Sequence, residues 1–286
     1  MVTQRRRRSW TSAGVLLDAA SYLVLAVGVV VVPDPVKPLA AVALAVVIRR
    51  LFMQGHEAGH DRLWASRRAN EAVGRLLLLP SYTSYRLWDL AHNRTHHAFT
   101  RFKALDYVWR PMSPARFRVV SPWRRALERA YRTGLGHGLY YFVEIYCRKL
   151  IVPSPRFVPE RRAAYWGDTL AVAGFAVLQL GAYVTAAVAT RQSLVWVLFT
   201  AMVLPFALWN VLAGSASFVG QTRPEIAWFD DIDEWRAAKP QLLDSVRVTP
   251  AAFVDAVRRC KLYDYKAHRW LDFKGRITAE IRPLSR

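Results

Sequence analysis

The chain has 286 residues, of which 53% are hydrophobic, yet its formal net charge is +20. In a soluble protein this basicity would indicate a nucleic-acid partner. Here the long apolar stretches carry almost no charge, and the lysines and arginines lie between them. This layout is typical of a membrane protein with basic cytosolic loops and argues against nucleic-acid binding. Cys147 and Cys260 lie far apart in segments expected in the cytosol, so no disulfide is expected.

Four apolar segments are long enough to cross a bilayer, which takes about 20 residues per helix. They cover approximately residues 14–32, 38–54, 169–189 and 193–214. Short turns join the first to the second and the third to the fourth, which predicts two hairpins. Asp168 or Thr169 is expected to cap the third helix, and Pro205 to kink the fourth.

The positive charges predict the orientation of these segments. The two short turns hold only Lys37 and Arg191, whereas the remaining lysines and arginines fall at the ends of the spans or outside them, including Arg5–Arg8. The positive-inside rule therefore places both termini, the loop 55–165 and the tail 221–286 in the cytosol. We expect a single all-α domain over residues 1–286, an integral membrane protein of four transmembrane helices in two hairpins with a cytosolic helical cap. Within the loop, residues 71–79 and 123–131 are expected to form short helices.

Five of the seven histidines fall in two short clusters, His56-Glu57-Ala58-Gly59-His60 and His92-Asn93-Arg94-Thr95-His96-His97. On an α-helix, residues four apart share a face, which pairs His56 with His60 and His92 with His96. His97 would point about 100° further round. Imidazole binds iron, zinc and copper well. The expected metal ligands are therefore His56, His60, His92, His96 and His97, whereas His137 and His268 are expected to be structural.

With the patterns H-x-x-x-H and H-N-x-T-H-H, these clusters resemble the histidine boxes of the membrane-bound fatty acid desaturases, which the chain as a whole resembles. Further segments resemble the bacterial branch of that family, among them Asp106–Trp109, Arg223–Phe229 and Tyr263–Gly275. The resemblance implies two irons, held by histidines from three boxes, that activate dioxygen to introduce a double bond into a lipid acyl chain. It also implies a membrane lipid or acyl substrate and an electron donor such as ferredoxin or a cytochrome b5-type protein.

The chain departs from the family pattern after the fourth span. Gln221 stands where the family carries a histidine, and no third histidine box follows Trp235. Two irons need roughly four or five protein ligands each, so five histidines are too few. The candidates for supporting or supplementary roles are Asp89, Asp106, Asn210 and Gln221, with His268 a further possibility. Helix capping or hydrogen bonding to a histidine is the simpler role for the two aspartates, and an interhelical hydrogen bond for Asn210.

Two alternatives remain open at this point. The chain is a catalytically inactive desaturase homologue if the missing box removes the metal centre. The first box also fits H-E-x-x-H, in which two histidines bind zinc and Glu57 would be the base of a metalloprotease. The protease hypothesis leaves the second box unexplained, so the desaturase interpretation is preferred.

Overall fold

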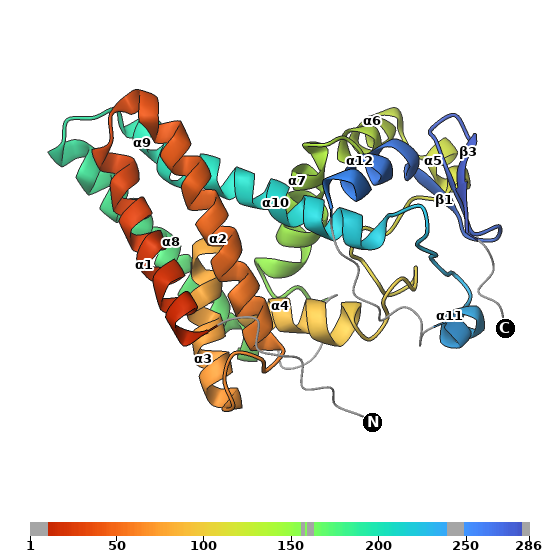
Figure 1. The fold of residues 1–286 in the computed structure, drawn as a ribbon, viewed down its shortest axis with the longest axis horizontal. Coiled ribbons are helices and arrows are strands. Elements are labelled where there is room, and N and C mark those ends of the chain that lie inside the picture. The colour runs from red at the N-terminus through yellow and green to blue at the C-terminus, as the bar shows by residue number, and fades with distance from the viewer. Residues whose placement is uncertain (1–10, 156–157, 159–162, 239–248, 282–286) are drawn as a thin grey trace. The chain divides into compact units, whose positions relative to one another are not determined.

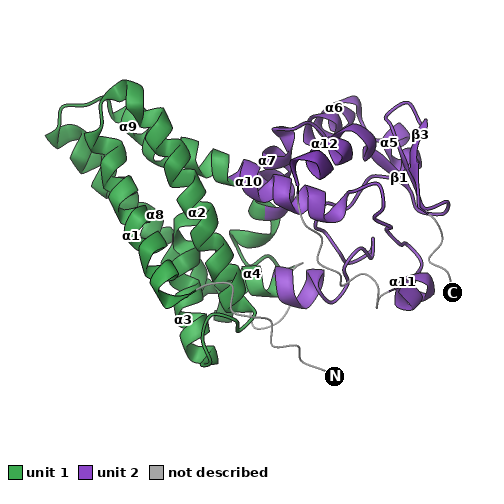
Figure 2. Cartoon of the chain, in the orientation of Figure 1, with its two compact units in different colours: residues 1–90, 146–209 green, residues 91–145, 210–286 purple. Residues whose placement is uncertain are grey.

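A computed structural model describes residues 11–155, 158, 163–238 and 249–281. The arginine run Arg5–Arg8 lies outside these residues. By its internal contacts the chain divides into two compact units, coloured separately in Figure 2. Unit 1 comprises residues 1–90 and 146–209, and unit 2 comprises residues 91–145 and 210–286.

Unit 1 is helical in its described residues, and its helices can be followed in Figure 1. A single 3-10 turn, Asp34–Val36, joins the first two helices, and Pro38 lies in the first turn of the second. Its α-helices are α1 (Ser12–Val31), α2 (Lys37–Gly59), α3 (Arg67–Leu78), α4 (Tyr85–Asp89), α8 (Ala163–Ala189) and α9 (Leu194–Leu198).

Three helical stretches in the described part of the chain are long and apolar enough to cross a membrane: Ser12–Val31, Ala163–Ala189 and Leu194–Gln221. The last runs through α9, a π-helical turn at Phe199–Val203, and α10 (Leu204–Gln221). Helix α2, which carries Arg49 and Arg50, covers the second expected span but is not among the three. The arrangement of four spans in two hairpins therefore stays a prediction.

Two buried charged groups in the helices of unit 1, Asp18 and Lys37, have polar partners. Asp18 of α1 is buried and accepts hydrogen bonds from Arg50 Nε, at 2.8 Å, and from Gln54 Nε2, both on α2. Lys37 is also buried, and its Nζ donates to Asp34, at 2.6 Å, and to the side chain of Gln192. These contacts satisfy ionised groups that would otherwise destabilise apolar helices.

The capping prediction for the third span needs revision, whereas the kink predicted at Pro205 stays a prediction. Helix α8 includes Ala163, so Asp168 lies inside it rather than capping its start. Its carboxylate instead accepts from Arg75 Nε and from the backbone N–H of Arg86, each at 2.9 Å. Pro205 follows the π-helical turn Phe199–Val203. Proline has no N–H to bond to the carbonyl four residues earlier, and this missing hydrogen bond favours an irregular turn such as the π-helical one.

Unit 2 contains short helices and a small sheet, so the all-α prediction holds for most of the chain but not for this part. Its helices are α5 (Pro114–Val119), α6 (Pro122–Tyr131), α7 (Gly136–Tyr140), α11 (Ile232–Ala238) and α12 (Pro250–Arg259), and a π-helix continues α7 over Tyr141–Leu150. The strands β1 (Leu262–Asp264), β2 (Arg269–Leu271) and β3 (Ile277–Glu280) form an antiparallel sheet in that order. Tyr263 lies opposite Trp270, and both are fully buried with Trp228 and Cys260.

Candidate metal centre

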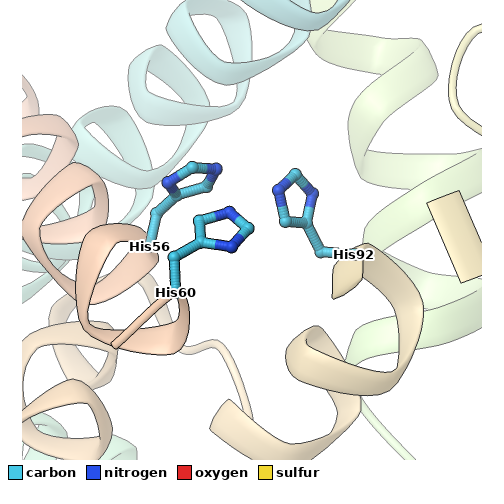
Figure 3. A group of neighbouring side chains, drawn as sticks. All are labelled: His56, His60 and His92. Atoms are coloured by element: carbon cyan, nitrogen blue, oxygen red, sulfur yellow. The ribbon is translucent and has the colours of Figure 1, made fainter. Parts of the chain in front are cut away.

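The first histidine box forms the last turn of α2. The imidazoles of His56 and His60 lie side by side, with ring centroids 4.6 Å apart, as the i,i+4 spacing predicts (Figure 3). His56 Nδ1 lies 3.2 Å from Glu57 Oε1. A carboxylate accepts hydrogen bonds but donates none, so Nδ1 carries the proton and Nε2 keeps its lone pair. The same bond lowers the pKa of Glu57, with further contributions from the charge of Arg62.

Trp88 of α4 supports the first box. Its ring lies 5.4 Å from that of His56 and 6.4 Å from that of His60, centroid to centroid. Gly59 makes this approach possible, because a Cβ there would lie 2.3 Å from the indole. Trp88 belongs to no sequence motif, and the glycine inside the box is the local sign of a close neighbour.

The second histidine box lies in a π-helical turn, Leu90–His96, rather than in an α-helix. The backbone N–H of His97 donates to the carbonyl of His92, five residues earlier, at 2.9 Å. The nearest imidazoles are therefore those of His92 and His97, whose Nε2 atoms are 3.0 Å apart. The rings of His92 and His96 are 5.6 Å apart, so the predicted i,i+4 pair is the looser one. Figure 3 shows the His92 side chain projecting from this helix.

Asp106 holds His96 in place. Its Oδ1 accepts from His96 Nδ1 at 2.9 Å and from the backbone N–H of Val108 at 3.0 Å, and its Oδ2 accepts from the N–H of Arg101 at 2.7 Å. Asp106 is completely buried and His96 is 6% exposed. The carboxylate fixes the proton on Nδ1, which leaves the lone pair of His96 Nε2 to bind a metal. The structure thus gives Asp106 the hydrogen-bonding contact that the sequence suggested.

Gln221 is the last residue of α10, and its side chain reaches the second box. Its Nε2 lies 3.4 Å from His96 Nε2, and its Oε1 is buried with no hydrogen-bond partner in the described structure. The indole N–H of Trp228 donates to the backbone carbonyl of Gln221 at 2.8 Å. Of the other two supplementary candidates, Asp89 ends α4 directly before the π-helical turn Leu90–His96 that carries the second box, and Asn210 is buried in α10.

The two remaining histidines make structural contacts. His137 is completely buried and stacks on Phe218 with ring centroids 3.9 Å apart. Burial, and then the charges of Arg132 and Lys261, lower the pKa of His137 from 6.5 to about 3. His268, at the turn between β1 and β2, lies 3.3 Å from the hydroxyl of Tyr263 and 3.4 Å from Glu234. The part of the chain that the structure describes leaves out residues 239–248, within the junction where the third box is missing.

The donor set suits a metal. It consists of imidazole nitrogens whose opposite ring nitrogens are fixed, in His56 and His96, by carboxylates. Such carboxylate–histidine pairs orient ligands and raise their basicity. Neutral imidazole serves iron and zinc alike, so this chemistry does not choose between them.

The sequence profile of the fatty acid desaturase family matches residues 35–256, and the chain belongs to this family. The match includes both histidine boxes and Gln221. Together with the three apolar helices, family membership indicates a membrane protein, and the family typically carries a metal cofactor.

Curated relatives include cyanobacterial lipid desaturases. The chain is 28% identical over 202 residues to an sn-1 acyl-lipid omega-3 desaturase (ferredoxin) of Synechocystis sp., covering 67% of this chain and 52% of the relative. It is 26% identical over 140 residues to an sn-1 oleoyl-lipid 12-desaturase of Anabaena variabilis, covering 48% and 38%. It is 21% identical over 243 residues to the enzyme of that name from Arthrospira platensis, covering 85% and 66%. The matches thus span less than two thirds of each relative.

Proposed function

We propose that this protein introduces a double bond into a lipid acyl chain, using metal held by its two histidine boxes. Family membership supports this reaction class. The observation that carries the proposal is the second box, where a buried aspartate fixes one imidazole and two others face each other at 3.0 Å. The proposed ligands are His56, His60, His92, His96 and His97.

Iron, when bound, would supply an oxidant strong enough to break unactivated C–H bonds. The overall reaction removes two hydrogens from adjacent acyl carbons. With two protons and two electrons from a donor, these reduce one dioxygen to two waters. The named specificity of the Synechocystis relative supports ferredoxin as that donor, and a cytochrome b5-type protein is the alternative.

The residues of the chain prepare the site for this chemistry. Glu57 and Asp106 each hold an Nδ1 proton, so His56 and His96 present Nε2 lone pairs. Trp88 packs against both imidazoles of the first box and shields one side of them from water. We propose that both boxes face the cytosol, on the basis of the positive-inside rule.

The polar contacts of the Glu57 carboxylate weigh against the zinc protease hypothesis. Its carboxylate contacts His56 at 3.2 Å and Arg62 at 3.6 Å, whereas a protease base must be available to a zinc-bound water.

The test combines metal analysis with lipid analysis. Detergent-purified protein is assayed for iron and zinc, and the fatty acids of a host that expresses the chain with a ferredoxin are compared with those of a host expressing His92→Ala. We expect iron in the purified protein. In the host that expresses the wild-type chain we expect acyl chains that have lost two hydrogens, and these should be absent from the host that expresses His92→Ala. Absence of bound metal, or bound iron without new double bonds, would favour the inactive homologue, and a single zinc would favour the protease.

A further inference from the structure

Gln221 lies against a candidate ligand, and its side-chain contacts leave its amide only partly satisfied. Its Nε2 is 3.4 Å from His96 Nε2, a long contact, and its Oε1 is buried without a donor. Its backbone carbonyl is tied to the Trp228 indole at 2.8 Å, so the residue itself is anchored. A buried amide oxygen without a donor is unfavourable and calls for a partner.

The electronic character of the neighbouring imidazole identifies the kind of partner. Asp106 accepts from His96 Nδ1, so His96 Nε2 presents a lone pair toward Gln221. The oxygen and nitrogen of an amide have nearly the same shape, and a half-turn of the terminal amide exchanges them. In that rotamer two lone-pair donors, His96 Nε2 and Gln221 Oε1, face each other. Two such groups attract a cation placed between them.

The spacing also fits a metal ion. Two donor atoms that each bind one ion at about 2.1 Å lie roughly 3 to 3.5 Å apart. The Gln221–His96 separation of 3.4 Å falls in that range, as does the 3.0 Å between His92 and His97 Nε2. Both pairs belong to the same compact unit.

We infer that Gln221 is a metal ligand that binds through Oε1 together with His96 Nε2. It thereby supplies an oxygen donor in a centre with too few histidines. This inference rests on the proposed function, because it assigns one more ligand to the same centre. An amide oxygen is a harder ligand atom than an imidazole nitrogen, although both are neutral. We therefore expect a metal bound by Gln221 and His96 to be held less tightly than a metal bound by two imidazoles.

The test measures iron binding by the full-length chain in detergent. Apoprotein is titrated anaerobically with Fe(II) against a competing chelator, and bound iron per chain is counted by elemental analysis. Gln221→Met removes the amide at similar size. Gln221→Glu and Gln221→His restore an oxygen or a nitrogen donor. The matched control is Thr222→Val, because the hydroxyl of Thr222, just after α10, donates to the Phe218 carbonyl at 2.7 Å.

We expect Gln221→Met to bind one iron at least about tenfold more weakly than the wild type, and the control to match the wild type. The glutamate and histidine variants should bind at least as tightly as the wild type, which a purely packing role would not predict. Unchanged binding by Gln221→Met refutes the inference and leaves the proposed function standing. Tighter binding by Gln221→Met also refutes it, since the amide would then be blocking His96. A wild-type chain that binds no iron overturns both.

Discussion

Asp106 offers a sharp test of how the second box is organised. Its carboxylate accepts three hydrogen bonds, from His96 Nδ1 and from the backbone N–H groups of Arg101 and Val108. In Asp106→Asn one acceptor oxygen becomes an NH2 group, which faces an N–H donor at the same place. At least one charge-assisted bond is lost, at about 1.5–3 kcal/mol, and a buried donor is left unpaired. We expect a total loss of roughly 2–4 kcal/mol of folding free energy and a 10- to 100-fold weaker hold on iron.

Two assays measure these effects, thermal unfolding in detergent and competition for Fe(II) with a chelator. The control is Asp230→Asn, which removes an exposed ion pair with Lys103 (3.1 Å) in the same unit and should cost no more than about 1 kcal/mol. If Asp106→Asn keeps the iron affinity and the stability of the wild type, the aspartate neither orients His96 nor holds the loop that follows the second box.

Three further predictions follow from the structure. His137 stays neutral in the folded state down to pH of about 3 but protonates near pH 6.5 when unfolded, so acidification should reduce stability below pH 6.5. The loss is about 1.4 kcal/mol per pH unit, about 2 kcal/mol by pH 5, and His137→Phe should remove this slope in unfolding experiments between pH 7.5 and 5. Gly59→Ala places a methyl group 2.3 Å from the Trp88 ring and should cost about 1–3 kcal/mol in thermal unfolding, whereas Gly181→Ala, with open space around it, should be neutral. Glu57→Gln keeps an acceptor for His56 and should retain most iron binding and desaturation in the lipid assay, whereas complete loss of both would show that the charge of Glu57 is required at the site.

The helices were the most predictable part of this protein. Apolar length located α1, α8 and the last span, and Pro38 in a first turn marked the start of α2. The short helix expected at residues 123–131 appears as α6, with the Ser121 hydroxyl accepting from the N–H of Arg124. These features depend on local composition and capping, which a sequence displays directly.

Features that depend on contacts distant in sequence were harder to predict. The pairing of Asp168 with Arg75 joins residues 93 positions apart, so a capping role seemed the simplest interpretation of that aspartate. The small sheet consists of strands of three or four residues, too short for an alternating pattern to be recognised. For Gln221, family resemblance drew attention to the residue, but only the fold placed it beside His96.

The π-helical turn in the second box has a consequence for anyone who wishes to transplant it. Grafted onto a regular α-helix of a designed bundle, H-x-x-x-H-H would keep its letters but bring His96 over His92, and His97 would swing away. The 3.0 Å contact between His92 and His97 depends on the wider turn. A faithful graft must therefore carry the extra residue in that turn, and deleting a single residue there would be as disruptive as removing a histidine.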